Sequence, residues 1–356
     1  MSGLAIWHVG DLRRPTRTWQ RQQAFERLGH RVVPFSYYPE TASPDDPCAT
    51  GLRHLAVRIA WRARIGWAAL DVNGALRAST VEAPDVIVVE KGNAVSPFTL
   101  YALKKRWPNV PLVSFSEDDM FASHNRSLQY LAGLRLYDLV VTTKSYNANA
   151  NELPALGAKR VLFVNKSYEP TVHRPVTVTD ADREAIGGPV VFVGTFEAPR
   201  AESMLRLAEA GIAVRVWGNG WAPYAKRHPL LRVEGRPLYG EDYVRAIAAS
   251  DINLAFLRKM NRDLQTDRTM EIPACGAFML AERTDEHLAL FRDGEEAAFF
   301  SSDDELIALV RRALAEPAWR RSVAAAARRR SVDSGYSHDE TLRRILDAAV
   351  TARAPR

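Results

Sequence analysis

Short apolar runs rich in β-branched residues alternate along the chain with stretches of helical period. In the first half the apolar runs predict strands at 4–9, 31–35, 86–90, 112–115, 139–143 and 160–164. The stretches between them predict helices at about 18–28, 97–106, 126–134 and 147–156. Alternation of this kind is typical of a parallel sheet covered by helices, so this half is expected to form one doubly wound α/β domain.

The pattern is interrupted once and then resumes. Residues 165–188 contain two prolines, a polar run and Gly187-Gly188, which predict a linker. After it, strands are predicted at 189–194, 213–217, 231–234, 252–256 and 278–281, with a helix ending near Gly211. We therefore expect two Rossmann-like domains, 1–168 and 169–335, with a ligand cleft between the carboxyl ends of their sheets.

Composition narrows the class of protein. A chain of 356 residues with 47% hydrophobic and 25% charged residues is long enough for two globular cores. Cys48 and Cys275 lack metal spacing and favour a reduced, cytoplasmic compartment, and the first residues read as a strand rather than a signal peptide. No apolar run is long enough to span a membrane.

The net charge of +6 leaves three kinds of partner open: nucleic acid, an anionic membrane face and an anionic small substrate. No recognisable nucleic-acid motif occurs in the sequence. We therefore expect no nucleic-acid partner.

The richest chemistry lies in the segment 261–280, where polar residues precede a short apolar turn and a buried strand. Arg268 and Glu271 are three residues apart and share one face of a helical turn. A helix start beside a guanidinium suits a diphosphate, because free N–H groups and a bidentate donor converge there. A carboxylate one turn later suits the vicinal hydroxyls of a sugar or ribose. Together they indicate a nucleotide sugar.

This segment resembles a known family. The run E-I-P-A-C-G-A-F-M-L at 271–280 is similar to the E-x-x-A-C-G segment in the C-terminal domain of GT-B glycosyltransferases, and R-T-M before it resembles the CgeB-like branch. In that family Glu271 would match the second glutamate of an E-x7-E motif, which is associated with the donor ribose. Asp263 stands where the first glutamate is expected and is one methylene shorter.

The resemblance implies an enzyme and its architecture. Two Rossmann-like domains would face each other across a cleft, and residues 336–356 would form a helix that crosses back to the N-terminal domain. The activity would be metal-independent transfer of a sugar from a nucleoside diphosphate to a hydroxyl acceptor: a glycan, a lipid-linked or a small molecule. Cell-surface polysaccharide or glycoconjugate synthesis is the expected process, without a cofactor.

Further donor residues follow from the loops of the second domain. Gly194 and Thr195 end a predicted strand and are expected to let a phosphate group come close to the backbone. Arg200 is expected to bind the diphosphate, by similarity to a G-x5-R segment of CgeB-like proteins. Trp217, Gly218 and Tyr239 are assigned to the pocket of the nucleotide base, although a packing role suits Trp217 equally well and suits Tyr239 slightly better. The remaining donor candidates are Gly10, Asn261, Asp263 and Thr269, with helix capping as the alternative for Thr269.

Acid–base candidates come from the run 117–124 in the first domain. Asp118, Asp119 and His124 are the side chains suited to accept a proton from an attacking hydroxyl, unless they merely cap a loop. Arg14 and Arg17 are candidates for contact with an anionic acceptor.

The basic, tryptophan-bearing stretch 52–67 either contacts an anionic membrane or forms a helix with an arginine-rich outer face. Two other functions stay open: a sugar-nucleotide epimerase of related fold, and a non-catalytic protein that binds nucleotide sugars. A nicotinamide oxidoreductase is disfavoured, because no strand leads into G-x-G-x-x-G.

Overall fold

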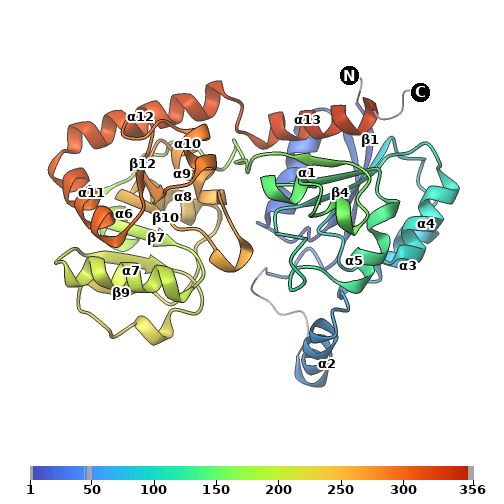
Figure 1. The fold of residues 1–356 in the computed structure, drawn as a ribbon, viewed down its shortest axis with the longest axis horizontal. Coiled ribbons are helices and arrows are strands. Elements are labelled where there is room, and N and C mark those ends of the chain that lie inside the picture. Colours follow the sequence, from blue (N-terminus) through green and yellow to red (C-terminus); the bar gives the residue numbers. More distant parts are fainter. Residues whose placement is uncertain (1–2, 44, 46–49, 352–356) are drawn as a thin grey trace. The chain divides into compact units, whose positions relative to one another are not determined.

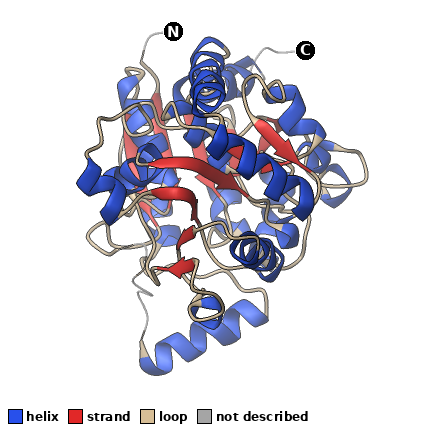
Figure 2. Cartoon of the chain, turned by 90° about the vertical axis from the view of Figure 1, so that its left-hand side faces the viewer, coloured by secondary structure: helices blue, strands red, loops and turns tan. Residues whose placement is uncertain are grey.

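The computed structural model describes residues 3–43, 45 and 50–351. Two compact units are present. Unit 1 comprises 1–165 together with 338–356, and unit 2 comprises 166–337. Each unit contains one six-stranded sheet with helices on both faces (Figures 1 and 2). The expectation of two doubly wound α/β domains is confirmed.

The sheet of unit 1 is parallel throughout. Its strands lie in the order β2-β1-β3-β4-β5-β6, and Ile6 pairs with Val32 on one side and with Val86 on the other. The bounds are β1 (Ala5–Gly10), β2 (Arg31–Ser36), β3 (Val86–Glu90), β4 (Leu112–Ser116), β5 (Leu139–Thr142) and β6 (Val161–Phe163).

Helices cover this sheet because alternate strand residues point to opposite faces. One face packs against α1 (Arg17–Arg27) and α13 (His338–Thr351), burying Phe25 and Ile345. The other face packs against α3 (Val72–Ala78), α4 (Pro97–Arg106) and α5 (Leu128–Gly133), burying Leu100 and Tyr130. The last helix of the chain is thus part of unit 1. The remaining helix, α2 (Gly51–Arg62), buries none of its residues.

Unit 2 repeats the same plan with the strand order β12-β11-β10-β7-β8-β9. The strand bounds are β7 (Gly188–Val193), β8 (Val214–Trp217), β9 (Leu231–Val233), β10 (Ser250–Ala255), β11 (Met279–Glu282) and β12 (Ala298–Phe300). Its helices are α6 (Asp180–Ala185), α7 (Ala198–Glu209), α8 (Gly240–Ala248), α9 (Asp267–Ala274), α10 (Asp285–Leu290), α11 (Asp303–Ala315) and α12 (Pro317–Asp333).

Some predicted elements were wrong for identifiable reasons. The helix predicted at 147–156 is replaced by two 3-10 turns, Ser145–Ala148 and Pro154–Leu156. Proline cannot donate to the turn before it, and the Asn147 amide donates to the buried Asp119 and to Glu152. The segment predicted as a linker contains α6, which begins with a capping box between Thr179 and Asp182. Strand β12 was not predicted.

None of the helices within 3–43, 45 and 50–351 is long and apolar enough to cross a bilayer. Cys275 is a buried free thiol whose pKa is raised by burial, so it is chemically inert. Cys48 lies outside the described residues.

A buried ion pair attaches α1 to the centre of the first sheet. Arg21 of α1 donates two hydrogen bonds of 2.7 Å to the carboxylate of Glu90 at the end of β3, and His8 Nε2 lies 3.2 Å from the same carboxylate. Burial by itself raises the pKa of Glu90, but Arg21 and His8 outweigh it and hold the pKa below its ordinary value. The pair therefore favours the folded state while Glu90 is ionised.

Replacing Glu90 by glutamine should lower the free energy of unfolding at neutral pH by about 3 kcal/mol, because the buried Arg21 loses the closer of its two carboxylate partners and keeps only Glu117. Because the folded pKa is depressed, this contribution is complete above the unfolded value of about 4.3 and is lost as the pH falls through the folded value. Urea unfolding of both proteins between neutral and acid pH should show their difference shrinking only below about pH 4.

The control is Glu82→Gln, because the ion pair of Glu82 with Arg31 is exposed and should contribute little. Equal stability of Glu90→Gln and the unchanged protein at neutral pH would contradict the role assigned to the buried pair.

Candidate functional sites at the carboxyl ends of the two sheets

The strands of each sheet are parallel, so the loops that follow them emerge at one edge. In unit 2 this edge brings together the loops after β7, β8 and β10 and the start of α9. In unit 1 it brings together the loops after β1, β3 and β4. These are the edges where ligands bind in open α/β sheets.

In unit 2, Gly194 and Gly218 let two loops touch. The Gly194 N–H donates to the Trp217 carbonyl, and the Gly194 carbonyl accepts from Trp221 Nε1 at 2.8 Å. Gly218 has φ of +151°, and a Cβ there would lie 2.0 Å from the Gly194 carbonyl oxygen. Any side chain at 218 would force the loops apart, so glycine is required. Thr195 follows as an exposed residue.

Two guanidinium groups meet beside this loop. Arg268 lies 4.9 Å from the centroid of the Phe192 ring, and Arg200 lies 5.5 Å from the same centroid. A Cβ on Gly194 would lie 2.5 Å from a terminal nitrogen of Arg268, so the glycine leaves room for that guanidinium. Arg268 is thus held against both the ring and the glycine loop.

Arg200 is the more buried of the two, with 3% of its surface exposed. It pairs with Glu197 at 3.0 Å and donates to the Leu257 carbonyl. Burial and then the neighbouring Arg268 lower the pKa of Arg200 to about 10, which leaves the group charged near neutral pH. Among the described residues no hydrogen bond reaches Nε of either arginine. Two neighbouring guanidinium groups, one of them buried, favour the binding of an anion.

Helix α9 presents Arg268 and Glu271 as the sequence spacing indicated. Tyr243 donates to a Glu271 carboxylate oxygen at 2.6 Å, and His173 Nε2 lies 3.7 Å from the other. Burial, followed by the Glu271 charge, raises the pKa of Tyr243 well above its ordinary value, so the phenol stays a donor. Glu271 is thus a buried carboxylate with a fixed orientation.

Thr269 has a structural role. Its hydroxyl accepts from the Thr266 N–H in the capping box of α9 and lies 2.9 Å from His287 Nε2. Burial lowers the pKa of His287 to about 4, so that ring is neutral. The capping alternative considered for Thr269 is the one that the geometry supports.

The other donor candidates of unit 2 occupy different surroundings. Asn261 donates to Asp263 at 2.8 Å, and both are buried in the loop after β10. Trp217 is a core residue whose indole N–H donates to the Ile186 carbonyl, which supports its packing alternative. Tyr239 is exposed at the start of α8, one helical turn before Tyr243.

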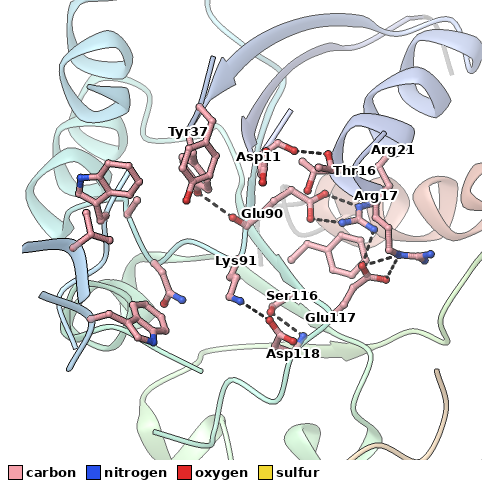
Figure 3. A pocket seen from close by; sticks show the side chains of 18 of the residues that line it. Asp11, Thr16, Arg17, Arg21, Tyr37, Glu90, Lys91, Ser116, Glu117 and Asp118 are labelled. Carbon is pink, nitrogen blue, oxygen red and sulfur yellow. Dashed lines mark hydrogen bonds and ion pairs between the residues drawn. The ribbon is translucent and has the colours of Figure 1, made fainter. Parts of the chain in front are cut away.

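Unit 1 contains a pocket of about 480 Å³ at the carboxyl ends of its strands (Figure 3). One side is charged and the other is apolar and aromatic. The charged side is formed by Asp11, Arg17, Arg21, Glu90, Lys91, Glu117 and Asp118, and the apolar side by Tyr37, Tyr38, Val57, Trp61, Ile65 and Trp67.

The charges of this pocket compensate one another. Arg17 pairs with Glu117 at 3.0 Å, and Arg21 also reaches Glu117 at 3.2 Å (Figure 3). Lys91 pairs with Asp118 at 2.6 Å. Arg17 therefore already has a carboxylate partner, which weakens the prediction that it meets an anionic acceptor.

The three acid–base candidates fall in three different environments. Asp118 lines the pocket, and its pairing lysine adopts a left-handed backbone with φ of +59°. Asp119 is fully buried and accepts from the Phe121 N–H and the Asn147 amide, so it cannot reach a substrate and has a structural role. His124 is exposed and does not line the pocket.

Gly10 and Arg14 also have structural explanations. A Cβ on Gly10 would lie 2.6 Å from Thr18 and 2.9 Å from Glu90, so the glycine leaves room for these two side chains beside the end of β1. The Arg14 guanidinium lies over the ring of Trp19, 5.2 Å from its centroid. Gly10 belongs to unit 1, whereas the other donor candidates belong to unit 2.

Sequence reasoning missed several residues of these sites. Phe192, His173 and Tyr243 carried no motif of their own, although Tyr243 shares a helical face with Tyr239, four residues earlier. Glu90 is the last residue of a strand that was predicted correctly, and that position was the available signal. No group of three or more His, Cys, Asp or Glu side chains suited to a metal ion occurs within the described part of the chain.

Comparison with known proteins bears on both units. Residues 200–347 match the family model described as "Glycosyl transferase-like". The matched segment includes Arg200, Arg268 and Glu271. No curated protein matches the sequence.

Three solved structures are similar along their whole length. HepE from Anabaena, in complex with UDP and glucose, has 12% identity and a TM-score of 0.59, covering 97% of this chain and 100% of HepE. The apo structure of OtsA has 13% identity and a TM-score of 0.65, covering 98% and 99%. Sucrose-phosphate synthase from Thermosynechococcus elongatus has 14% identity and a TM-score of 0.58, covering 98% and 100%.

At these identities the structural matches show the fold, and the family match adds the glycosyltransferase likeness of the second half. The chain has the GT-B fold of glycosyltransferases, and its residues 200–347 are similar to the glycosyl transferase-like family.

Proposed function

We propose that this protein transfers a sugar from a nucleoside-diphosphate sugar to a hydroxyl acceptor. The observation that carries the proposal is the pair of guanidinium groups held beside the Gly194 loop. Both arginines, Arg200 and Arg268, lie within the segment that matches the family. HepE, which shares the fold, was crystallised with UDP and glucose. The CgeB-like branch and a role in surface glycan synthesis stay predictions.

Arg200 and Arg268 would neutralise the departing diphosphate. Charge develops on that group as the glycosidic bond breaks, and preorganised cations stabilise it without reorganisation. Arg200 is suited to this role because burial and the neighbouring Arg268 disfavour its positive charge and lower its pKa. A diphosphate bound between Arg200 and Arg268 would offset the repulsion between their positive charges.

Glu271 would accept hydrogen bonds from the ribose hydroxyls. Tyr243 holds one carboxylate oxygen, which fixes the direction of the remaining lone pairs. Asn261 and Asp263 are proposed for the sugar, and Tyr239 for the base. Thr195 and the N–H groups that begin α7 are proposed for phosphate approach.

The acceptor would bind in the pocket of unit 1, where Asp118 is the proposed general base. Its carboxylate lines the pocket beside Lys91, within reach of a bound hydroxyl. The reaction requires that the donor of unit 2 reach the acceptor of unit 1. No metal or cofactor is part of the proposal, and cytoplasmic location stays a prediction.

Replacing Arg268 by alanine should weaken UDP binding by about 10- to 100-fold, since one charge-assisted contact contributes about 1.5–3 kcal/mol. Titration calorimetry with whichever of UDP, GDP and TDP raises the melting temperature of the unchanged protein measures this loss. Arg206→Ala is the matched control, because Arg206 is an exposed arginine of unit 2 that pairs with Asp303. Unchanged affinity in Arg268→Ala would refute the assignment.

Replacing Asp118 by asparagine should lower the transfer rate by about 10²- to 10⁴-fold and leave donor affinity unchanged, because the base is lost and unit 2 is untouched. Asp119→Asn should instead lower the melting temperature, since its buried carboxylate accepts hydrogen bonds from two backbone N–H groups and the Asn147 amide. Radiolabelled sugar transfer and calorimetry on both variants separate the two roles. A full transfer rate in Asp118→Asn would remove it as the base.

One incubation distinguishes the competing functions. A nucleotide sugar incubated without an acceptor should be recovered unchanged, or slowly hydrolysed. Conversion to an epimer would favour the epimerase, and saturable binding without turnover on any acceptor would favour a non-catalytic binding protein.

A further inference from the structure

Helix α2 differs from every other described α-helix of its unit in its exposure. It buries none of its residues, and both views show it standing clear of the sheet (Figures 1 and 2). Its outer side carries Leu52, Leu55 and Ile59, which are 87%, 53% and 58% exposed. The spacing of three and four residues places these side chains in one stripe along the helix.

The charges around this stripe are all of one sign. Residues 51–70 contain four arginines, at positions 53, 58, 62 and 64, and no aspartate or glutamate. Arg58 and Arg62 are exposed on α2 one turn apart, beside the apolar stripe. An apolar face flanked by arginines is complementary to an anionic bilayer, where apolar side chains enter the interface and cations meet the lipid headgroups.

The opposite side of the same helix belongs to the acceptor pocket. Val57 and Trp61 line that pocket one turn apart, and Ile65 and Trp67 in the following loop continue the wall. Arg53 lies over the Trp67 ring, 5.6 Å from its centroid, and Trp67 packs against Tyr38 at 5.8 Å. Thus one helix has an exposed apolar face on one side and forms the apolar wall of the pocket on the other.

The charged side of the pocket argues against an acceptor that is itself strongly anionic at that point. Arg17 and Lys91 are paired with Glu117 and Asp118, and Asp11 is paired with Arg13. A neutral hydroxyl suits the Asp118 side, and a hydrocarbon group suits the side formed by Val57 and Ile65. A bare sugar would leave the aliphatic part of this wall without a partner.

We propose that α2 docks on an anionic membrane and that the pocket behind it receives the hydroxyl end of an amphiphilic, lipid-borne acceptor. The inference rests on the proposed function, since it names the acceptor class of that activity. The outer face of α2 binds the bilayer, and its inner face holds the first part of the acceptor's hydrocarbon chain while the hydroxyl lies at Asp118.

The first test measures docking without any reaction. The full chain is sedimented with phosphatidylcholine vesicles that contain or lack phosphatidylglycerol. Binding is expected only with the anionic lipid, and the variant Leu52→Ser/Leu55→Ser/Ile59→Ser should bind about tenfold more weakly or worse. Arg58→Gln/Arg62→Gln should also lose about tenfold, and its residual binding should be less sensitive to salt.

Matched variants control for generic surface effects. Phe98→Ser/Tyr101→Ser removes two exposed aromatic residues from α4 of the same unit, and Arg321→Gln/Arg329→Gln removes two exposed charges from α12. Both should bind vesicles as the unchanged protein does. The proposal would be overturned if the α2 variants bound vesicles as well as the unchanged protein does. It would also be overturned if the variants lost self-association of the protein instead of vesicle binding, because a second copy of the chain would then be the occupant of this face.

The second test concerns the inner face. Octyl β-glucoside, below its micelle concentration, should change the tryptophan emission because Trp61 and Trp67 line the pocket, and methyl β-glucoside should bind about tenfold more weakly or worse. Val57→Ser should weaken octyl glucoside binding and keep vesicle binding, whereas the triple variant of the outer face should do the reverse. Equal binding of the two glucosides would exclude an amphiphilic acceptor.

The two proposals fail in different experiments. Loss of vesicle and octyl glucoside binding with normal UDP binding would overturn the lipid-borne acceptor and leave sugar transfer intact. Normal vesicle binding without any nucleotide binding would overturn the proposed function and, with it, the acceptor assignment.

Discussion

The parallel direction of all strands is the constraint on which the sites of this protein depend. In a parallel sheet every strand ends at the same edge, so loops that are far apart in sequence emerge together. In unit 2 this places Gly194 against Gly218 and brings Arg200 beside Arg268. In unit 1 it places the ends of β1, β3 and β4 around one pocket. The chemistry of each unit is therefore a property of one sheet edge.

The two edges differ in charge balance. In unit 1 the cations Arg17, Arg21 and Lys91 are each matched by a carboxylate at 3.2 Å or less, so the pocket presents little net charge. In unit 2, Arg200 and Arg268 lie near the same aromatic ring with Glu197 as the carboxylate partner of Arg200. A compensated pocket suits a neutral hydroxyl compound, and an excess of guanidinium groups suits a diphosphate. This difference supports the proposal that unit 2 binds the donor and unit 1 the acceptor.

Helix α2 has one face toward the pocket of unit 1 and an apolar stripe on its exposed side. Its apolar outer stripe is not used for folding, because the core of unit 1 is completed by α1, α13, α3, α4 and α5. The exposed stripe adds nothing to the core, and arginines flank it. Binding to an anionic membrane surface would explain both features. The basic amphipathic character was visible in the sequence, but the contact of its inner face with the pocket was not.

The sequence by itself determined the class of fold and the chemistry of one helix. Apolar runs predicted the approximate positions of eleven of the twelve described strands and their division into two sheets, because buried parallel strands need continuous apolar runs. The spacing of Arg268 and Glu271 placed them on one helical face, and α9 has them there. Local periodicity carries that information without knowledge of the rest of the chain.

Only the tertiary structure decided which polar residues face a ligand and which hold the fold. Asp118 and Asp119 are adjacent in sequence, yet one lines a pocket and the other is buried under Asn147. Thr269 and Trp217 had two interpretations each, and their partners His287 and Ile186 come from elsewhere in the chain. Burial and most of these hydrogen-bond partners are set by contacts between distant segments, so local patterns could not separate Asp118 from Asp119 or assign Trp217 to the core. The capping box of Thr266 and Thr269 is the local exception.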